Sequence, residues 1–271
     1  MYTSDHEHMV EDKCFQVTHI QKVLNVIKAN FQGFFDKFLE SQQSYISPDR
    51  VDELHDKFIV DFNGKHLVFD RSRACKELFH EAISDFEKDR ETYIDLFNQE
   101  HLEEYEDDPQ QFKSRVLKIN TPIIRKTLQN IYAEQLDKYR AAFARANAMD
   151  LLTIVSRLSK FSEDYVKNKY NPEIFESIVY YKDFDLTVLD TEEYTVHGVV
   201  GGGIKSTMLY KNYPEVFSSR SRLAVWALWY LVGKEKFGCE MDSEFLMIDL
   251  KKNSTQQNYF YPYELFEFYA L

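Results

Sequence analysis

Glycine and proline are scarce in this chain, with eight and six of them in 271 residues. Disordered chains and loop-rich all-β folds need more of both, so the composition predicts an ordered and mostly helical protein. Cysteine is also rare. Cys14, Cys75 and Cys239 lie far apart and show no CxxC spacing, which argues against a disulfide framework or a zinc site and predicts free thiols in a reducing compartment.

The sequence also lacks long apolar runs. No stretch approaches the ~18 uncharged apolar residues of a membrane span, and the first residues are polar, so we expect no membrane association and a cytoplasmic protein. Basic residues are in the minority. With 33 Lys and Arg against 45 Asp and Glu, the net charge of −12 argues against a broad nucleic-acid footprint but leaves room for a local basic patch.

Aromatic residues are plentiful instead, with 22 Phe and 18 Tyr in a chain that is 44% hydrophobic, so there is ample material for a core. Four prolines follow a residue that can cap a helix, at Ser47-Pro48, Asp108-Pro109, Thr121-Pro122 and Asn171-Pro172. A capping side chain accepts from a free N–H of the first turn, and proline in the next position loses no hydrogen bond. Each pair therefore predicts a helix start.

The N-terminal region, 1–102, is predicted to be helical with one β-hairpin. Apolar residues recur every three or four positions over Cys14–Leu39 and again over Ser72–Phe97, which predicts two helices, the second carried by Phe79, Ile83, Phe86, Tyr93 and Phe97. Between them, two strand-like runs at 57–70 flank Asn63-Gly64, a pair that suits a tight hairpin turn.

The rest of the chain divides at an acidic stretch. Residues 103–110 are predicted to be an acidic linker, followed by a helical region at 111–170 whose early cations, Arg115 to Lys126, balance the acids. Residues 171–271 are predicted to form a compact α+β unit with two strands, at 244–250 and 256–261, and a closing aromatic helix. The predicted fold class is α+β, predominantly α-helical.

Half of the glycines fall between Gly198 and Gly203. Such a stretch can approach another group closely and, before a helix start, can bind an anion. It is not a Walker A loop, because Ile204 separates Gly203 from Lys205 and displaces the lysine. It is not a Rossmann fingerprint either, because Ser206 stands where the third glycine is needed and no βαβ pattern surrounds it.

Residues 198–217 resemble the helix-hairpin-helix motif of DNA glycosylase-like proteins. In that family the backbone N–H groups of the hairpin bind a DNA phosphate. The resemblance implies a nucleic-acid-binding site made of residues on and after the glycines: Gly201, Gly202, Gly203, Lys205, Ser206, Thr207, Lys211, Arg220 and Arg222. It does not extend to catalysis, because only Glu215 is acidic between Lys205 and Glu235, where the family's lysine requires an aspartate.

A second pattern, at 242–251, resembles the core of PD-(D/E)xK nucleases. Asp249 and Lys251 are two apart and would share a face of a strand, and Asp242 is the preceding acid. Two carboxylates, Asp242 and Asp249, would hold Mg²⁺ while Lys251 supports an attacking water. No cofactor is established by the sequence, and Mg²⁺ is implied only if the chain is a nuclease.

Three hypotheses therefore stand. The first is an intracellular protein that contacts DNA or RNA through the glycine turn. The second is a Mg²⁺-dependent nuclease. The third is a non-enzymatic interaction module whose acidic surface engages a basic protein partner.

Overall fold

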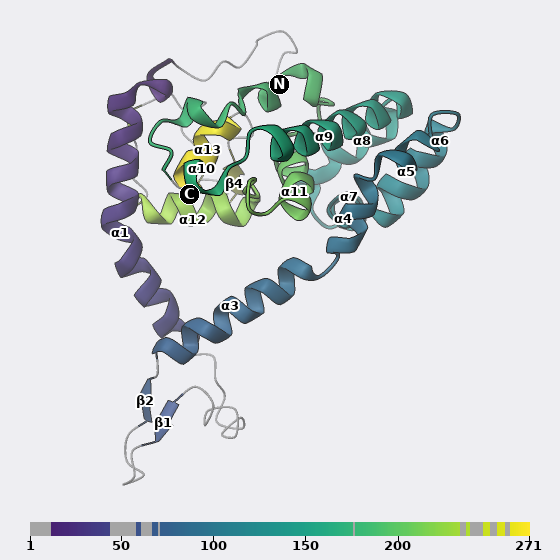
Figure 1. The fold of residues 1–271 in the computed structure, drawn as a ribbon. Helices are drawn as coiled ribbons and strands as arrows, with labels where there is room; N and C mark the ends of the chain where they lie inside the picture. Colours follow the sequence, from purple (N-terminus) through teal and green to yellow (C-terminus); the bar gives the residue numbers. More distant parts are fainter. Residues whose placement is uncertain are drawn as a thin grey trace.

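The chain folds as a succession of helices joined by short turns (Figure 1). The structure is a computed structural model that describes residues 12–43, 58–60, 67–69, 71–175, 177–233, 237–238, 246–249, 254–257 and 261–271. In the first part of the chain the helices are η1 (Asp12–Phe15), α1 (Val17–Gln43), α3 (Arg71–Glu87), α4 (Arg90–Leu96), α5 (Gln99–Glu103), α6 (Pro109–Gln111), the π-helix η3 (Phe112–Asn120), α7 (Pro122–Gln129), η4 (Glu134–Leu136), α8 (Asp137–Arg145) and α9 (Ala148–Asn168).

Short helices then lead into the glycine region and the C-terminal helices. They are α10 (Pro172–Phe175), η5 (Tyr181–Phe184), η6 (Thr187–Asp190), η7 (Glu192–Tyr194), α11 (Gly202–Asn212), α12 (Arg222–Leu231) and α13 (Tyr263–Ala270). The helix starts predicted at Pro109, Pro122 and Pro172 are confirmed. Asp108 caps the first of them through Gln111 N (3.1 Å), whereas Ser47-Pro48 lies outside the described residues.

The predicted α+β fold class is wrong, because the core is helical. Strands β1 (Phe58–Val60) and β2 (Leu67–Phe69) pair antiparallel, as do β3 (Leu246–Asp249) and β4 (Ser254–Gln257), and each pair stands alone as a two-stranded ladder. The described core side chains belong to helices and to the turns between them. Two strands offer too little surface to build a core. The fold is therefore predominantly α-helical, both around the predicted hairpin and in the C-terminal part that was predicted to be α+β.

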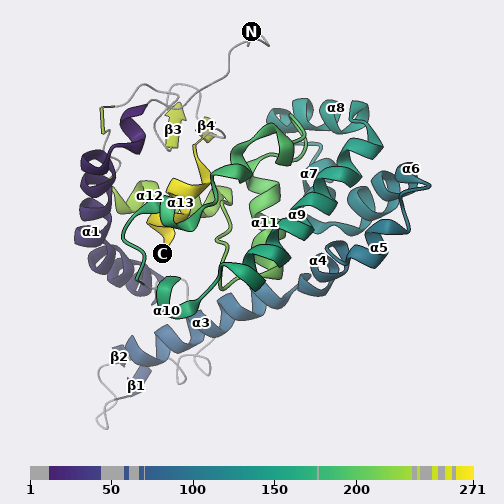
Figure 2. The same ribbon diagram turned by 45° about the horizontal axis from the view of Figure 1, so that its top comes forward.

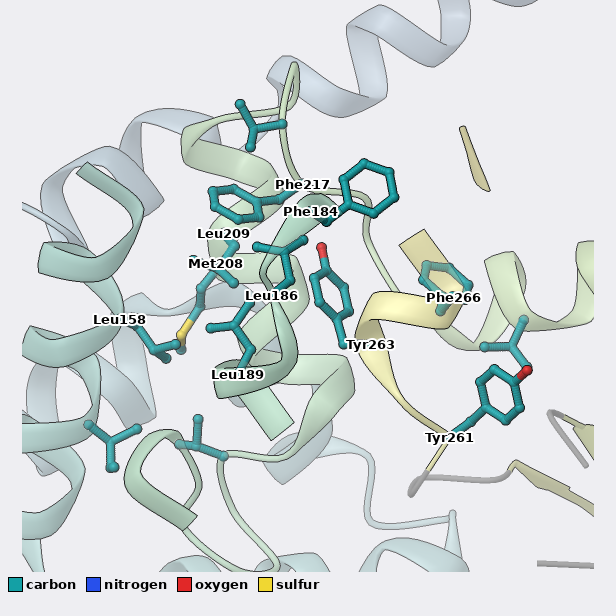
Figure 3. Packing of buried hydrophobic residues seen from close by; sticks show 14 of the residues in the cluster. Leu158, Phe184, Leu186, Leu189, Met208, Leu209, Phe217, Tyr261, Tyr263 and Phe266 are labelled. Carbon is teal, nitrogen blue, oxygen red and sulfur yellow. The ribbon is translucent and has the colours of Figure 1, made fainter. Parts of the chain in front are cut away.

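The core gathers around α9, which is amphipathic and buries Leu151, Val155 and Leu158. Helices α5, α6, η3 and α11 pack against it. On its other side the last helix, α13, inserts Tyr263 beside Phe184 of η5, Leu189 of η6 and Leu186 between them (Figure 3). One buried cluster thus joins residues from all three predicted regions, and the proposed boundaries between those regions stay a prediction.

Helix α3 buries none of its side chains and, with the second half of α1, forms an arm, whereas Ile20, Val23 and Ile27 in the first half of α1 belong to the core cluster. Both views show α3 running from the end of α1 back to α4 (Figures 1 and 2). The first half of α1 packs on α12, where Asn30 donates to Leu231 O (2.7 Å). The apolar stripe predicted for the second helix is buried only at Tyr93 and Phe97, while Phe79 and Ile83 are 61% and 59% exposed. The periodicity predicted helical structure here, but it could not predict that much of the apolar stripe would stay exposed to solvent.

The long helix predicted at 72–97 is broken in two. Asp89 adopts a left-handed conformation with φ of 67°, so α3 ends at Glu87 and α4 starts at Arg90. Such φ values are rare outside glycine, although aspartate tolerates them better than most residues. Lys211 on α11 secures the break by donating to the carbonyls of Phe86 and Lys88.

We expect Leu158→Ala to destabilise the protein by about 2–5 kcal/mol, because a fully buried leucine in the centre of α9 loses its packing and leaves a cavity. Urea unfolding followed by circular dichroism measures the difference. Leu223→Ala, on an exposed side chain of α12, is the matched control and should change stability by no more than about 0.5 kcal/mol. Equal losses for both variants would contradict this placement of the core.

Candidate functional site

The glycine turn, residues 198–203, is a folded structural element with its own tight geometry. Val196 and Val200 exchange backbone hydrogen bonds of 3.2 and 2.8 Å, which closes a turn around Gly198. Gly198 has φ of +72°, and a Cβ there would lie 3.0 Å from the Ala142 side chain. The first glycine of the stretch is therefore required by the turn itself.

Gly202 is required for a different reason, the close approach of Arg220. A Cβ on Gly202 would overlap the Arg220 guanidinium, which is 2% exposed and donates to the carbonyl of Tyr261. The neighbouring glycines are less constrained. A methyl group on Gly201 would approach no described atom beyond its chain neighbours within 4 Å, and one on Gly203 would meet only the Arg220 carbonyl at 3.6 Å. The turn thus holds an internal arginine at the start of α11.

Lys205, the first lysine after the glycines, points into the protein. It is 3% exposed, and its ammonium donates to the carbonyl of Leu189 and to Thr195 Oγ1 (3.1 Å). Burial lowers its pKa to about 8, an effect that the nearby Asp190 opposes. Its hydrogen bonds are made to η6 and to the residue that follows η7.

Asp190, at the end of η6, lies near enough to both cations to interact with them electrostatically. The residue is exposed to solvent, and its carboxylate accepts a hydrogen bond from Tyr263 N (2.7 Å). Burial raises its pKa, while the charges of Arg220 and Lys205 act in the opposite direction. Burial likewise lowers the pKa of Arg220, and Asp190 opposes it. A carboxylate of the chain itself therefore interacts with the two cations that the sequence suggested for an external phosphate. We call Asp190, Lys205 and Arg220 the charge cluster.

Helix α13 adds two further buried acids beside the charge cluster. Glu264 accepts from Leu186 N (3.0 Å) and Thr187 Oγ1 (2.7 Å), which fixes η6 onto α13. Glu267 accepts from Ser218 N (2.9 Å) and Ser218 Oγ (3.0 Å). Burial raises the pKa of Glu267 to about 7, and the hydrogen bonds from Ser218 and Tyr263 oppose that rise.

The other residues predicted to bind nucleic acid also make contacts within the chain. Ser206 Oγ accepts from Arg220 N (3.0 Å), and Thr207 Oγ1 donates to Gly203 O (2.8 Å). Lys211 secures the junction of α3 and α4, as described above. Arg222 is the exposed first residue of α12. The structure brings Gly202 and Ser206 together at Arg220, and Lys205 and Arg220 both interact electrostatically with Asp190.

Of the three predicted nuclease residues, the structure describes Asp249. Asp249 is the last residue of β3, paired with Ser254, and Asp242 and Lys251 lie outside the described residues. In the described ranges no three His, Cys, Asp or Glu side chains come close enough to bind a metal ion together. The arrangement proposed for Mg²⁺ stays a prediction.

Across the described ranges, the helices are too short or too polar to cross a membrane.

An acidic surface lies on the side of the molecule opposite α1, around α5 and α6 (Figure 1). The residues of the predicted linker form the turn of a helical hairpin, whose two sides, α5 and α6–η3, both pack against α9. Six exposed carboxylates lie on α5 and this turn, and we call them the acidic surface: Glu100, Glu103, Glu104, Glu106, Asp107 and Asp108. None of the six takes part in an ion pair with another described residue.

The cations that follow in sequence do not neutralise the acidic surface. Arg115 and Lys118 are exposed on η3, Arg125 donates to Ile119 O (3.2 Å), and Lys126 lies 3.5 Å from Asp89. We call these four cations the basic surface. The expectation that they balance the acidic stretch is met only in part, since there are four cations for six carboxylates and none of these four described cations forms an ion pair with them.

Sequence reasoning missed Asp190, Glu264 and Glu267. A signal for the last two was present, because two glutamates three apart interrupt the otherwise apolar helix Tyr-Glu-Leu-Phe-Glu-Phe-Tyr at 263–269. Acids on the buried face of a helix imply internal hydrogen-bond donors. Asp190 had no comparable local signal, since its partners lie 15 or more residues away in sequence.

Comparison of the chain with protein-family models, with curated proteins and with solved structures finds no match in any of the three.

We expect Gly202→Ala to destabilise the protein, because the added methyl group must displace the buried Arg220 guanidinium from its carbonyl partner. Gly203→Ala is the matched control, one residue further along the same helix, where the methyl group meets only ordinary contacts. There alanine should be neutral or stabilising by up to about 1 kcal/mol, as its helix propensity predicts. Thermal unfolding of both variants measures the contrast, and a Gly202→Ala variant as stable as Gly203→Ala would contradict the packing described.

We expect Glu267 to make stability fall as the pH rises from about 4.5 to about 7. Its pKa is raised in the folded state, so the folded protein holds a proton that the unfolded chain has released across this window. The loss amounts to about 1.4 kcal/mol for each unit by which the pKa is raised. Urea unfolding at several pH values should show a flatter profile for Glu267→Gln. An unchanged profile would contradict the assignment, and Glu215→Gln on the surface serves as control.

Proposed function

We propose that this protein is a non-enzymatic interaction module that binds a basic protein partner through its acidic surface. The observation that supports the proposal is the set of six exposed carboxylates, none of which forms an ion pair within the described part of the chain. Concentrated like charge is unfavourable for the folded chain by itself. A partner that supplies the opposite charge would relieve this repulsion.

The acidic surface is presented from a well-packed backbone. Leu102 and Phe112 are buried beneath the hairpin, and Tyr105 packs on Phe112 with ring centroids 5.7 Å apart. His101 in turn lies 3.2 Å from the Tyr105 hydroxyl through its Nε2 atom. A surface fixed in this way loses little conformational entropy when a partner binds. The net charge of −12 would also accelerate the encounter with a basic protein.

Nucleic-acid binding through the glycine turn has less support from the geometry. Lys205 and Arg220, the cations nearest the glycines, are almost fully buried and donate to the chain's own carbonyls. Asp190 already supplies the negative charge that a phosphate would bring. A phosphate at the turn would have to compete with this carboxylate.

Catalysis of the nuclease type receives no support of its own, since two of its three residues, Asp242 and Lys251, lie outside the described residues. A cytoplasmic location, expected from the cysteine pattern, forms part of the same proposal for an interaction module.

We expect the protein to bind a fluorescent lysine-rich peptide at low salt, and the double variant Glu103→Lys with Glu104→Lys to weaken that binding on the order of tenfold. Fluorescence anisotropy measures the affinity. Glu163→Lys with Asp164→Lys is the matched control, because it changes the net charge equally on an exposed part of α9. Equal weakening by both variants would show that only the net charge matters, and the proposal would fail.

A further inference from the structure

The basic surface follows the acidic surface directly along the chain, and acidic and basic residues do not intermix in this part of the sequence. Residues 91–108 contain eight acids and neither lysine nor arginine, whereas residues 109–133 contain five cations and no acid. The boundary falls at the turn of the helical hairpin, with the acids on α4, α5 and the turn and the cations on η3 and α7. The two surfaces are neighbours along the chain, because only α6 separates Asp108 from η3, which packs against α6.

The outward face of η3 carries the part of the basic surface that is open to a partner. Phe112, Val116 and Leu117 point into the core. The other side of this wide helix exposes Arg115, Lys118 and Ile119, the last of them 55% exposed. Arg115 and Lys118 have no intramolecular partner among the described residues. These two cations thus accompany an exposed apolar side chain, an arrangement suited to an interface.

A partner on this end of the molecule must match both signs. Opposite the basic surface it must be acidic, and opposite the adjacent acidic surface it must be basic. A nucleic acid satisfies only the first condition, because its phosphates would face the six carboxylates. A second copy of this chain satisfies both when a two-fold axis passes between the two surfaces, since each acidic surface then meets the other copy's basic surface.

We propose that two copies of this chain associate through these surfaces, with Arg115, Lys118 and Ile119 of each copy against the acidic surface of the other. This inference rests on the proposed function, and it identifies the basic partner as a second copy. The contact is charge-driven and has one small apolar centre, so it belongs to the weak, reversible class of interfaces.

The salt dependence gives a first distinction. Two molecules of net charge −12 repel each other, and salt screens that repulsion. If local complementarity drives association, added salt weakens it, whereas association limited by net repulsion becomes stronger in salt. We expect the dimer fraction, measured by sedimentation velocity, to fall as salt rises from about 0.05 to 0.5 M, over which the screening length shortens from about 14 to 4 Å.

A charge exchange tests the pairing directly. The basic-reversed variant, Arg115→Glu with Lys118→Glu, and the acid-reversed variant, Glu103→Lys with Glu104→Lys, each place like charges opposite one another in a homodimer. Each alone should raise the dimer dissociation constant on the order of tenfold or more. Mixed together, they restore opposite charge at both contacts, so the mixture should form a heterodimer at least as well as the wild type forms a homodimer. Circular dichroism verifies that both variants fold.

The outcomes separate the two proposals. A wild-type chain that stays monomeric at low salt, or a mixture that fails to associate while both variants are folded, overturns self-association. If self-association is absent but the acid-reversed variant binds the lysine-rich peptide more weakly than the wild type, the proposed interaction module stands with a basic partner other than a second copy. If peptide binding is unchanged as well, both proposals fail. Glu163→Lys with Asp164→Lys should leave the dimer intact, and its dissociation would overturn the assignment to these surfaces.

Discussion

Two cations enclosed in the protein interior, Lys205 and Arg220, need hydrogen-bond acceptors and a nearby negative charge. Removing a charged side chain from water is costly unless it is paired and hydrogen-bonded. Lys205 and Arg220 donate to the carbonyls of Leu189 and Tyr261, and the charge of Asp190 nearby favours their protonated forms. These contacts tie η6, α11 and the segment before α13 into one unit, so the centre of the fold depends on them.

The same requirement explains the glycines. A side chain at Gly202 would occupy the space of the Arg220 guanidinium, and a residue other than glycine at position 198 would strain the turn that precedes α11. Glycine-rich turns at helix starts are associated with anion binding because they expose backbone N–H groups. Here the close approach that glycine permits is made by the Arg220 guanidinium of the same chain.

The sequence predicted local structure well and tertiary partners poorly. Proline after a capping residue located helix starts at Pro109 and Pro172, because capping depends on neighbours only. Periodicity could not tell that Phe79 and Ile83 would be exposed, since this depends on which element lies opposite α3. The carboxylate of Asp190 was missed for the same reason. Short strand-like runs led to the wrong fold class, because nothing in a run of that length shows that helices alone build the core.

Helix α13 binds segments that precede it by many residues in the chain, and this order has a consequence for biosynthesis. The ribosome delivers Leu186, Asp190 and Ser218 before Tyr263, Glu264 and Glu267, which bind them. Until α13 has been synthesised, the backbone N–H groups of Leu186 and Ser218 lack the carboxylates that accept from them, and the apolar side chains around Tyr263 are not yet covered. These segments can therefore take their final arrangement only after a single eight-residue helix has been made.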